Sequence, residues 1–398
     1  MVRLTDTNEI LKVHEDHTGV LDIQSDLGVH NKADLGKAYT PGVAVLSKLI
    51  AKHPELKNKY TVSGKLVALI TDGSAVLGLG NIGPAGGLPV IEGKALLYKD
   101  LAGINAIPIA VNQESPEEIV KTIQNISQSF AGIHLEDIAA PKCFEIEDAL
   151  SQTLNIPVYH DDQEGTAIVV LAGLINAAKV VGKSLDYLHV VINGIGASGL
   201  ATAKLLYAAG ITHLTLVDVY GVVTANDSRY NRYQREFAAQ IGTSDDQKGL
   251  KLTDVMDDQD VFIGLSDQHL LSGHDVQRMA QDPIIFALAN PVPEIEPEEA
   301  AKAGAKVIAT GSSQHPNQVN NILAFPGLFK GLLASGITHV DAKLQLVVAK
   351  ALASVVQTPT AEEVVPGVFN EQVVATVSQA VEDYADDQDQ QRELVTED

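Results

Sequence analysis

The chain has 398 residues, of which 45% are hydrophobic and 5% aromatic, with a formal net charge of -23 at pH 7. This length is too great for one typical domain and predicts two domains with a C-terminal addition. The abundance of Gly, Ala, Val, Ile and Leu favours an α/β protein with buried strands. The negative charge argues against nucleic acid and anionic membranes as partners, because both repel an acidic chain.

The cysteine content and the N-terminal sequence point to a reducing compartment. Cys143 is the single cysteine, so an intramolecular disulfide cannot form, and we expect a buried or near-site thiol without a catalytic role. The N-terminus, MVRLTDTNEI, lacks the apolar core of a signal peptide. The most apolar stretch, residues 166–181, is interrupted by polar residues and is too short to span a bilayer. We therefore expect a soluble cytoplasmic protein.

The first part of the chain predicts alternating strands and helices. Strands are expected at 64–70, 106–111, 132–135 and 156–160, and helices at 93–101, from Pro116 onward and at 166–181. Ser115 suits an N-cap, because Pro116 and two glutamates follow it. Two of the strands end in adjacent acids, Glu136-Asp137 and Asp161-Asp162. Ligands of α/β sheets bind at the carboxyl ends of the strands, where these acids lie.

The second part predicts a doubly wound parallel sheet. Residues 188–223 form a strand, turn, helix, strand pattern, and further strands are expected at 260–265, 284–289 and 306–310. The chain from about residue 331 is helical in pattern, with an acidic tail at 383–398 that we expect to fray. The predicted fold is α/β. It comprises an N-terminal mixed α/β domain (1–160), a Rossmann-type NAD-binding domain (161–335) and a C-terminal helical segment (336–398).

The turn at residues 194–199 carries the fingerprint of a dinucleotide site. It reads GIGASG, follows an apolar strand and opens a helix, and the next strand ends in Asp218. Asp218 would accept hydrogen bonds from the adenosine ribose, while Val219 and Tyr220 offer no cation to a 2′-phosphate. NAD is therefore expected, and NADP less so. The residues expected around the pyrophosphate are Gly194, Gly196, Ala197, Ser198 and Gly199.

The two acidic pairs predict a divalent metal site. Three converging carboxylates make an all-oxygen site suited to Mg²⁺ or Mn²⁺, with water and substrate as further ligands. Zinc is not expected, because the chain has no Cys and His set at zinc-ligand spacing. The alternative for either pair alone is a solvated acidic surface.

Together these motifs resemble the malic enzyme family over residues 10–380. The ordered set consists of Tyr39-Thr40-Pro41-Gly42-Val43-Ala44, Thr71-Asp72-Gly73, Leu77-Gly78-Leu79-Gly80-Asn81, Glu92-Gly93-Lys94-Ala95, Leu135-Glu136-Asp137-Ile138, Asp161-Asp162-Gln163-Glu164-Gly165-Thr166-Ala167, Phe286-Ala287-Leu288-Ala289-Asn290-Pro291 and Asn320-Asn321-Ile322-Leu323-Ala324-Phe325-Pro326-Gly327. A single match would be weak, but the set in this order is specific.

The resemblance implies a short bacterial NAD-dependent enzyme that oxidatively decarboxylates L-malate to pyruvate. The implied metal ligands are Glu136, Asp137 and Asp162, with Asp161 supporting Lys94. Lys94 and Tyr39 would form the acid–base pair, with Lys94 kept neutral by desolvation so that it accepts the hydroxyl proton. Asn290 and Asn320 would contact the substrate and the nicotinamide end of the cofactor. The family also implies a homodimer, and the sequence leaves open whether Tyr39 acts within its own subunit.

One position departs from the larger members of the family. They carry a carboxylate-binding arginine shortly after the Thr-Asp-Gly motif, where this chain has Ala75. Ser74 and nearby backbone amides are candidates to hold the substrate carboxylate, with Asn290 and Asn320.

Three other functions fit parts of this pattern. A metal-dependent oxaloacetate decarboxylase would use the second half of the same reaction on the same scaffold. An amino-acid-type dehydrogenase would need no metal, so the acidic pairs count against it. A non-catalytic NAD-binding module would need no acid–base pair, which Lys94 and Tyr39 argue against. Dependence of activity on the metal separates these alternatives.

Overall fold

The computed structural model describes residues 7–76 and 78–396, and the side chains of 391–396 are left out of the description. Leu77, in one of the glycine-rich motifs, lies outside the described residues. The first sheet is parallel, with strand order β2-β1-β3-β4. Its strands are β1 (Leu66–Thr71), β2 (Asn105–Ala110), β3 (Gly132–Glu136) and β4 (Val158–His160). The helices that connect them are α5 (Gly83–Ala102), α6 (Pro116–Ile126) and α7 (Lys142–Thr153).

The second sheet has the order β10-β9-β8-β5-β6-β7. Its strands are parallel except for β7, which pairs antiparallel with β6 and makes the sheet mixed at that edge. The strands are β5 (His189–Asn193), β6 (His213–Asp218), β7 (Gly221–Val222), β8 (Val261–Gly264), β9 (Ile284–Ala287) and β10 (Val307–Thr310). Its helices are α8 (Thr166–Val181), α9 (Ala197–Ala208), α10 (Arg232–Gln240), α11 (Gly273–Gln277) and α12 (Pro297–Ala303). The predicted α/β class and Rossmann-type second sheet are confirmed.

A central helix joins the two sheets. The helical stretch Asp161–Val181 is apolar and long enough to cross a membrane, but 72% of its apolar window is buried inside the structure. It begins with a π-helical turn, Asp161–Gly165, and continues as α8, whose C-terminus is capped by Gly182 in the left-handed conformation. This stretch is therefore a core helix, and it carries Asp161 and Asp162 at its first turn.

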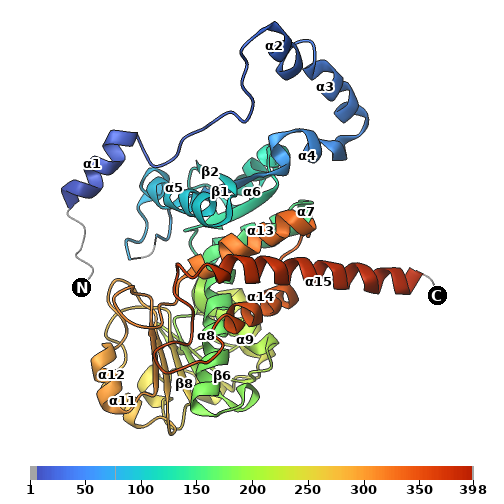
Figure 1. Ribbon diagram of the computed structural model, residues 1–398. Helices are drawn as coiled ribbons and strands as arrows, with labels where there is room; N and C mark the ends of the chain where they lie inside the picture. The colour runs from blue at the N-terminus through green and yellow to red at the C-terminus, as the bar shows by residue number, and fades with distance from the viewer. Residues whose placement is uncertain (1–6, 77, 397–398) are drawn as a thin grey trace.

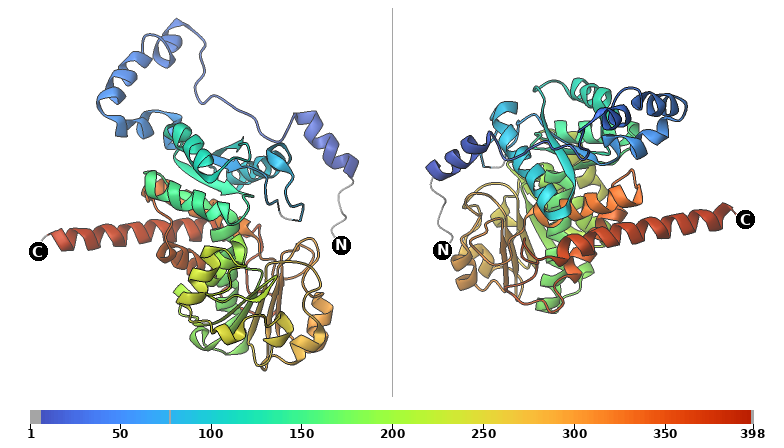
Figure 2. Two further views of the ribbon diagram at one scale, coloured as in Figure 1. Left: turned by 180° about the vertical axis from the view of Figure 1, so that it is seen from behind. Right: turned by 45° about the horizontal axis from the view of Figure 1, so that its top comes forward.

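The C-terminal helices cross between the two sheets (Figure 1). They are α13 (Phe325–Ser335), α14 (Ala342–Ser354) and α15 (Gln372–Thr396). Gly327 and Gly331 let α13 lie close to α15, because a Cβ on either would meet the Val377 or Val381 side chain at under 3 Å. The helical C-terminal segment is confirmed, but the expectation of a frayed acidic tail is wrong, since α15 continues to Thr396 and projects from the body (Figure 2).

One helix begins ten residues before its predicted start. The glycine-rich stretch predicted as a loop contains the first turns of α5, which starts at Gly83 with Pro84 in its first turn. Gly87 faces β1 there, and a Cβ on it would lie 3.2 Å from the Thr71 Cγ2 atom. The absence of a side chain at Gly87 lets the helix pack closely against the strand. From sequence alone, a glycine with this role cannot be told from a glycine in a turn.

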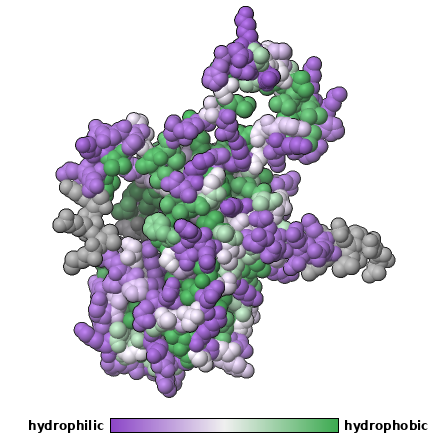
Figure 3. All heavy atoms as spheres, in the orientation of Figure 1, coloured by the Kyte–Doolittle hydropathy of each residue, from purple (hydrophilic) through white to green (hydrophobic). Residues whose placement is uncertain are grey.

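The N-terminal residues extend away from the body. Helix α1 (Thr7–His17) leads to a long connection and then to α2 (Lys32–Ala38), α3 (Val43–Lys52) and α4 (Lys57–Tyr60). Helices α2 and α3 stand apart from the body in Figure 1 and in the left view of Figure 2. We call residues 31–60 the arm. Neither α2 nor α3 has a buried residue. Hydrophobic side chains are exposed along the arm (Figure 3), among them Leu35, Tyr39, Val43 and Val45.

Candidate active site

The two acidic pairs meet at the carboxyl edge of the first sheet. Strands β3 and β4 are parallel neighbours, and Leu135 pairs with His160, so the residues that follow each strand lie side by side. The backbone N–H of Asp137 donates to Asp162 Oδ2 at 2.8 Å. Asp137 itself adopts φ of +55°, an uncommon conformation for a residue with a side chain. The chain is therefore turned sharply at the point where it presents these carboxylates.

Three of the four acids form a group that suits a hard divalent cation. Glu136, Asp137 and Asp162 each offer an oxygen within 4.8 Å of the others. Asp137 Oδ2 is buried without a hydrogen-bond partner. Both ring nitrogens of the neighbouring His160 are also buried without a hydrogen-bond partner. Burial, then repulsion from Glu136, raises the pKa of Asp137 to about 8 and that of Asp162 to about 6. A cation would satisfy this unpaired oxygen and offset the crowded negative charge.

Lys94 lies against the remaining acid. Its ammonium, carried on α5, donates to Glu136 Oε2 at 2.6 Å and to Asp161 Oδ2. Burial alone lowers the pKa of Lys94, as expected from the sequence, but Asp161 and Glu136 outweigh this effect and raise the pKa above its ordinary value. The lysine is therefore charged in this arrangement, and desolvation does not keep it neutral. Although burial raises the pKa of Asp161, Lys94 brings it below its usual range.

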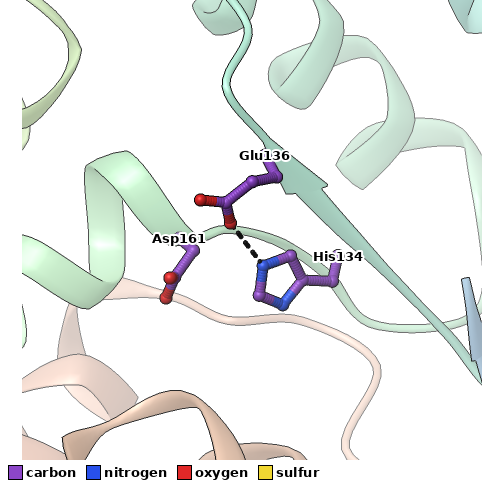
Figure 4. A group of neighbouring side chains, drawn as sticks. All are labelled: His134, Glu136 and Asp161. Atoms are coloured by element: carbon purple, nitrogen blue, oxygen red, sulfur yellow. Dashed lines mark hydrogen bonds and ion pairs between the residues drawn. The ribbon is translucent and has the colours of Figure 1, made fainter. Parts of the chain in front are cut away.

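Both carboxylates that pair with Lys94, those of Glu136 and Asp161, also accept hydrogen bonds from aromatic side chains. His134 Nε2 lies 2.9 Å from Glu136 Oε2, and Tyr98 Oη lies 2.8 Å from His134 Nδ1. Tyr159 Oη donates to Asp161 Oδ1 at 2.7 Å. Figure 4 shows His134, Glu136 and Asp161 converging. These three could offer metal ligands by proximity, but Lys94 already lies between the two carboxylates. Sequence reasoning missed Tyr98, His134 and Tyr159, although His134 sits two residues before Glu136 on the same face of β3.

The predicted dinucleotide turn has the geometry that its fingerprint requires. Gly194 has φ of +95°, and a Cβ there would lie 2.6 Å from Ser266 Cβ. A Cβ on Gly199 would lie 1.8 Å from the Gly194 carbonyl oxygen, so only glycine lets α9 approach the strand. Gly196 caps α9 and faces open space, with nothing within 4 Å of an added Cβ. The backbone amides of Ala197 and Ser198 begin the helix, and a helix N-terminus of this kind favours an anion such as a phosphate.

Asp218 ends β6 beside this turn and is held by a residue that the sequence did not indicate. Gln234, on α10, donates from Nε2 to Asp218 Oδ2 at 2.9 Å and to the Ile195 carbonyl at 2.8 Å. The side chain of Gln234 thus links the acid to the glycine turn. A capping box with Asn231 fixes Gln234 in turn, because each side chain bonds the other's backbone.

The substrate candidates lie at the junction of the two sheets. Asn320 caps the short helix Asn321–Leu323, accepting from Ile322 N, and Asn321 donates to the Asp161 carbonyl at 3.1 Å. Asn290 follows β9, and the glycine-rich loop approaches it, because a Cβ on Gly78 would lie 3.3 Å from its carbonyl oxygen. The Ser74 hydroxyl is already engaged, donating to Asp72 Oδ1 at 2.6 Å and accepting from Ala139 N at 2.8 Å.

Tyr39 is not brought to Lys94 within one chain. It is the C-cap of α2 on the arm, and its side chain is 66% exposed. The arm stands away from α5, which carries Lys94 (Figure 1). Cys143, by contrast, is fully buried on α7, where burial raises the pKa of its thiol.

Comparison with known sequences identifies the family. The profile of the malic enzyme N-terminal domain matches residues 23–151, and that of the malic enzyme NAD-binding domain matches residues 163–386. The chain belongs to the malic enzyme family. It is 47% identical to an NAD-dependent malic enzyme of Geobacillus stearothermophilus over 365 residues, covering 91% of this chain and 76% of that one. The recognised resemblance is therefore confirmed.

Two further malic enzymes agree in sequence and in fold. A bifunctional malic/malolactic enzyme of Bacillus subtilis is 47% identical over 376 residues, covering 94% of this chain and 91% of that one. The crystal structure of an NAD-dependent malic enzyme from Thermotoga maritima superposes with a TM-score of 0.89 at 43% identity, covering 94% of this chain and 98% of that chain. The chain is thus a malic enzyme with an NAD-binding domain.

Proposed function

We propose that this malic enzyme oxidatively decarboxylates L-malate to pyruvate and CO2, reducing NAD with Mn²⁺ or Mg²⁺ bound. The observation that carries the proposal is the position of Lys94. Its ammonium contacts Glu136 and Asp161, directly beside the group formed by Glu136, Asp137 and Asp162. A general base and a divalent cation would therefore act on the same end of one small substrate.

The residues divide the reaction between them. Lys94 takes the C2 hydroxyl proton, and the C2 hydride would pass to bound NAD. The C3–C4 bond then breaks, CO2 leaves, and the electron pair of that bond forms the C2–C3 double bond, giving the enolate of pyruvate. Tyr39 protonates C3. Glu136, Asp137 and Asp162 would hold the divalent ion, which would supply Lewis acidity to the substrate. Asn290, Asn320 and Ser74 are the proposed substrate contacts.

The base role requires Lys94 to lose its proton at the right stage. Its raised pKa comes chiefly from Asp161 and Glu136, with a further contribution from Asp162. Two of these three acids are proposed metal ligands. Neutralising their charge removes much of what holds the proton on Lys94, so that burial can lower its pKa toward the range of a base.

The cofactor preference rests on Asp218. With Gln234 on Oδ2 and the backbone N–H of Val219 on Oδ1, this carboxylate is fixed at the end of β6. A fixed carboxylate accepts hydrogen bonds from the ribose hydroxyls of NAD and repels a 2′-phosphate. We therefore propose NAD over NADP.

We propose further that a homodimer completes the site and that Tyr39 comes from the second subunit. The arm has no buried residue in α2 or α3 and exposes apolar side chains that a single chain leaves uncovered. It carries six lysines against two acids, in a chain whose net charge is -23. The acidic body of a second copy would offer this basic arm complementary charge, and association would cover its exposed apolar side chains.

Mixing two inactive variants tests this arrangement. Tyr39→Phe and Lys94→Ala are prepared separately, then unfolded and refolded together so that subunits exchange. If Tyr39 serves the partner's site, one site in each mixed dimer is intact, and activity returns to about one quarter of wild type at equal mixing. If Tyr39 serves its own subunit, no site is intact and the mixture stays inactive.

The activity itself is tested with L-malate, NAD and Mn²⁺, measuring NADH, pyruvate and lactate together in wild type and in Lys94→Ala. Wild type should form NADH and pyruvate in equal amounts, and the variant neither. Release of CO2 from oxaloacetate without reaction of malate would make the chain an oxaloacetate decarboxylase. Lactate without NADH would indicate malolactic activity, as in the name of the Bacillus relative. Cytoplasmic location and the domain limits 1–160, 161–335 and 336–398 stay predictions.

A further inference from the structure

His134 is a polar side chain enclosed by aromatic rings. It is fully buried on β3, and its ring lies among those of Tyr98, Tyr159, Phe325 and Phe329, with centroids 5.4 to 6.1 Å away. Its hydrogen-bonding neighbours in the described part of the chain are the Tyr98 hydroxyl and the Glu136 carboxylate. A buried imidazole keeps its place in such surroundings only when both nitrogens are satisfied, because an unpaired buried polar atom is costly.

The chemistry of the partners fixes the direction of both hydrogen bonds. In its ionised form, the form that binds a cation and pairs with Lys94, Glu136 can only accept, so His134 Nε2 then carries the hydrogen that faces Oε2. The four aromatic rings that enclose His134 disfavour a buried imidazolium, so the ring is neutral and its Nδ1 has a free lone pair. The Tyr98 hydroxyl must then donate to Nδ1. The chain of donors therefore runs from Tyr98 through His134 to Glu136.

Glu136 Oε2 receives a second donor, Lys94, at 2.6 Å. Two N–H donors on one oxygen fix the rotation of the carboxylate and leave Oε1 for another ligand. Lys94 and His134 approach that oxygen from different elements, α5 and β3. Tyr98 lies one helical turn after Lys94 on α5, so one helix supplies both the lysine and the start of the relay.

We propose that Tyr98 and His134 are positioning residues, a neutral hydrogen-bond relay that orients Glu136 so that Oε1 faces a divalent cation while Oε2 holds Lys94. The inference rests on the proposed metal dependence. Outer partners of metal ligands commonly set the orientation and affinity of the site. His134 is in this view not a metal ligand, although it lies within ligand distance of Glu136 and Asp161.

Direct measurement of Mn²⁺ binding tests the relay without relying on activity. Mn²⁺ is titrated into the metal-free full-length protein, with free Mn²⁺ followed by electron paramagnetic resonance. His134→Leu removes the donor to Glu136 and should weaken Mn²⁺ binding about 10- to 100-fold. Tyr98→Phe should weaken it about 10-fold, because Nδ1 loses its donor and the other tautomer becomes accessible. His134→Gln places an amide N–H near the Nε2 position and should restore affinity close to wild type.

Tyr159→Phe is the matched control. Like Tyr98→Phe, it removes a tyrosine hydroxyl from the aromatic cluster. The Tyr159 hydroxyl, however, donates to Asp161, which is outside the proposed metal group. Mn²⁺ affinity should therefore be unchanged in this variant. Loss of affinity in all four variants, His134→Gln included, would show that the cluster is merely structural and would overturn the relay. Circular dichroism melts of each variant confirm that the folded protein is being compared.

The tautomer can be read in the metal-free protein at about pH 9, where Glu136 is ionised. In a sample with ¹⁵N-labelled histidine, the His134 signals are identified by their loss in His134→Gln. The relay predicts a pyrrole-type Nε2 and a pyridine-type Nδ1, and the reverse pattern would refute it. This measurement needs no metal, so it decides the relay even where wild type fails to bind Mn²⁺. That failure would count against the proposed metal dependence instead.

Discussion

Replacing Gly199 with alanine should damage both the stability and the cofactor site of this malic enzyme. The added Cβ would lie 1.8 Å from the Gly194 carbonyl oxygen. Contacts of a real Cβ are rarely under 3.0 Å, so α9 or the turn must move by more than 1 Å. Overpacking of this kind costs about 1–3 kcal/mol. The better helix propensity of alanine offsets at most about 1 kcal/mol of this.

The same shift moves the first amides of α9 away from the pyrophosphate. NAD affinity should therefore fall together with the melting temperature, which should drop by several degrees (about 2–4 °C for each kcal/mol in a domain of this size). Gly196→Ala is the matched control, because nothing lies within 4 Å of its added Cβ. Its melting temperature should not fall, while NAD binding weakens because the methyl group occupies the phosphate's space.

Differential scanning calorimetry and NAD titration by fluorescence measure the two effects. The reasoning is refuted if Gly199→Ala melts like wild type, since the 1.8 Å approach would then not constrain the fold. It is equally refuted if Gly196→Ala binds NAD normally, since the open face of the turn would not be the phosphate site.

Three further predictions follow from the site and its surroundings. Burial raises the pKa of Asp137 to about 8 and that of Glu136 to about 7, so a cation must displace these protons near pH 6. Mn²⁺ affinity should then rise about 10- to 100-fold from pH 6 to pH 7, and calorimetry in two buffers counts the protons released; a flat profile would contradict the buried acids. Asp218→Ser should raise the ratio of NADP to NAD turnover, and Gln234→Ala should do so more weakly by freeing Asp218; unchanged ratios in steady-state kinetics would place specificity elsewhere. Ser115→Ala removes the side-chain oxygen that accepts from Glu118 N, and should lower the free energy of unfolding by about 1 kcal/mol in urea titrations; an unchanged free energy would show that this cap does not stabilise α6.

The local patterns of the sequence determined much of this fold. The strands that deliver Glu136 and Asp161, the helix after Ser115, and the strand, turn and helix around GIGASG lie close to where they were predicted. Each is encoded within one short stretch by apolar periodicity, a cap or glycine spacing. The two acidic pairs also indicated a shared site, because carboxyl ends of parallel strands meet at one edge.

The tertiary structure decided how these pieces act on one another. Because β3 and β4 are neighbours, three of the four acids form one group of carboxylates, and the fourth, Asp161, pairs with Lys94. The charge of Lys94 depends on acids 42 and 67 positions away, so burial inferred from sequence gave the wrong sign for its pKa shift. Gln234 reaches Asp218 across 16 residues, and Tyr98 reaches His134 across 36. These contacts join residues far apart in the sequence, and no periodicity or motif encodes them. Only the folded structure therefore reveals them.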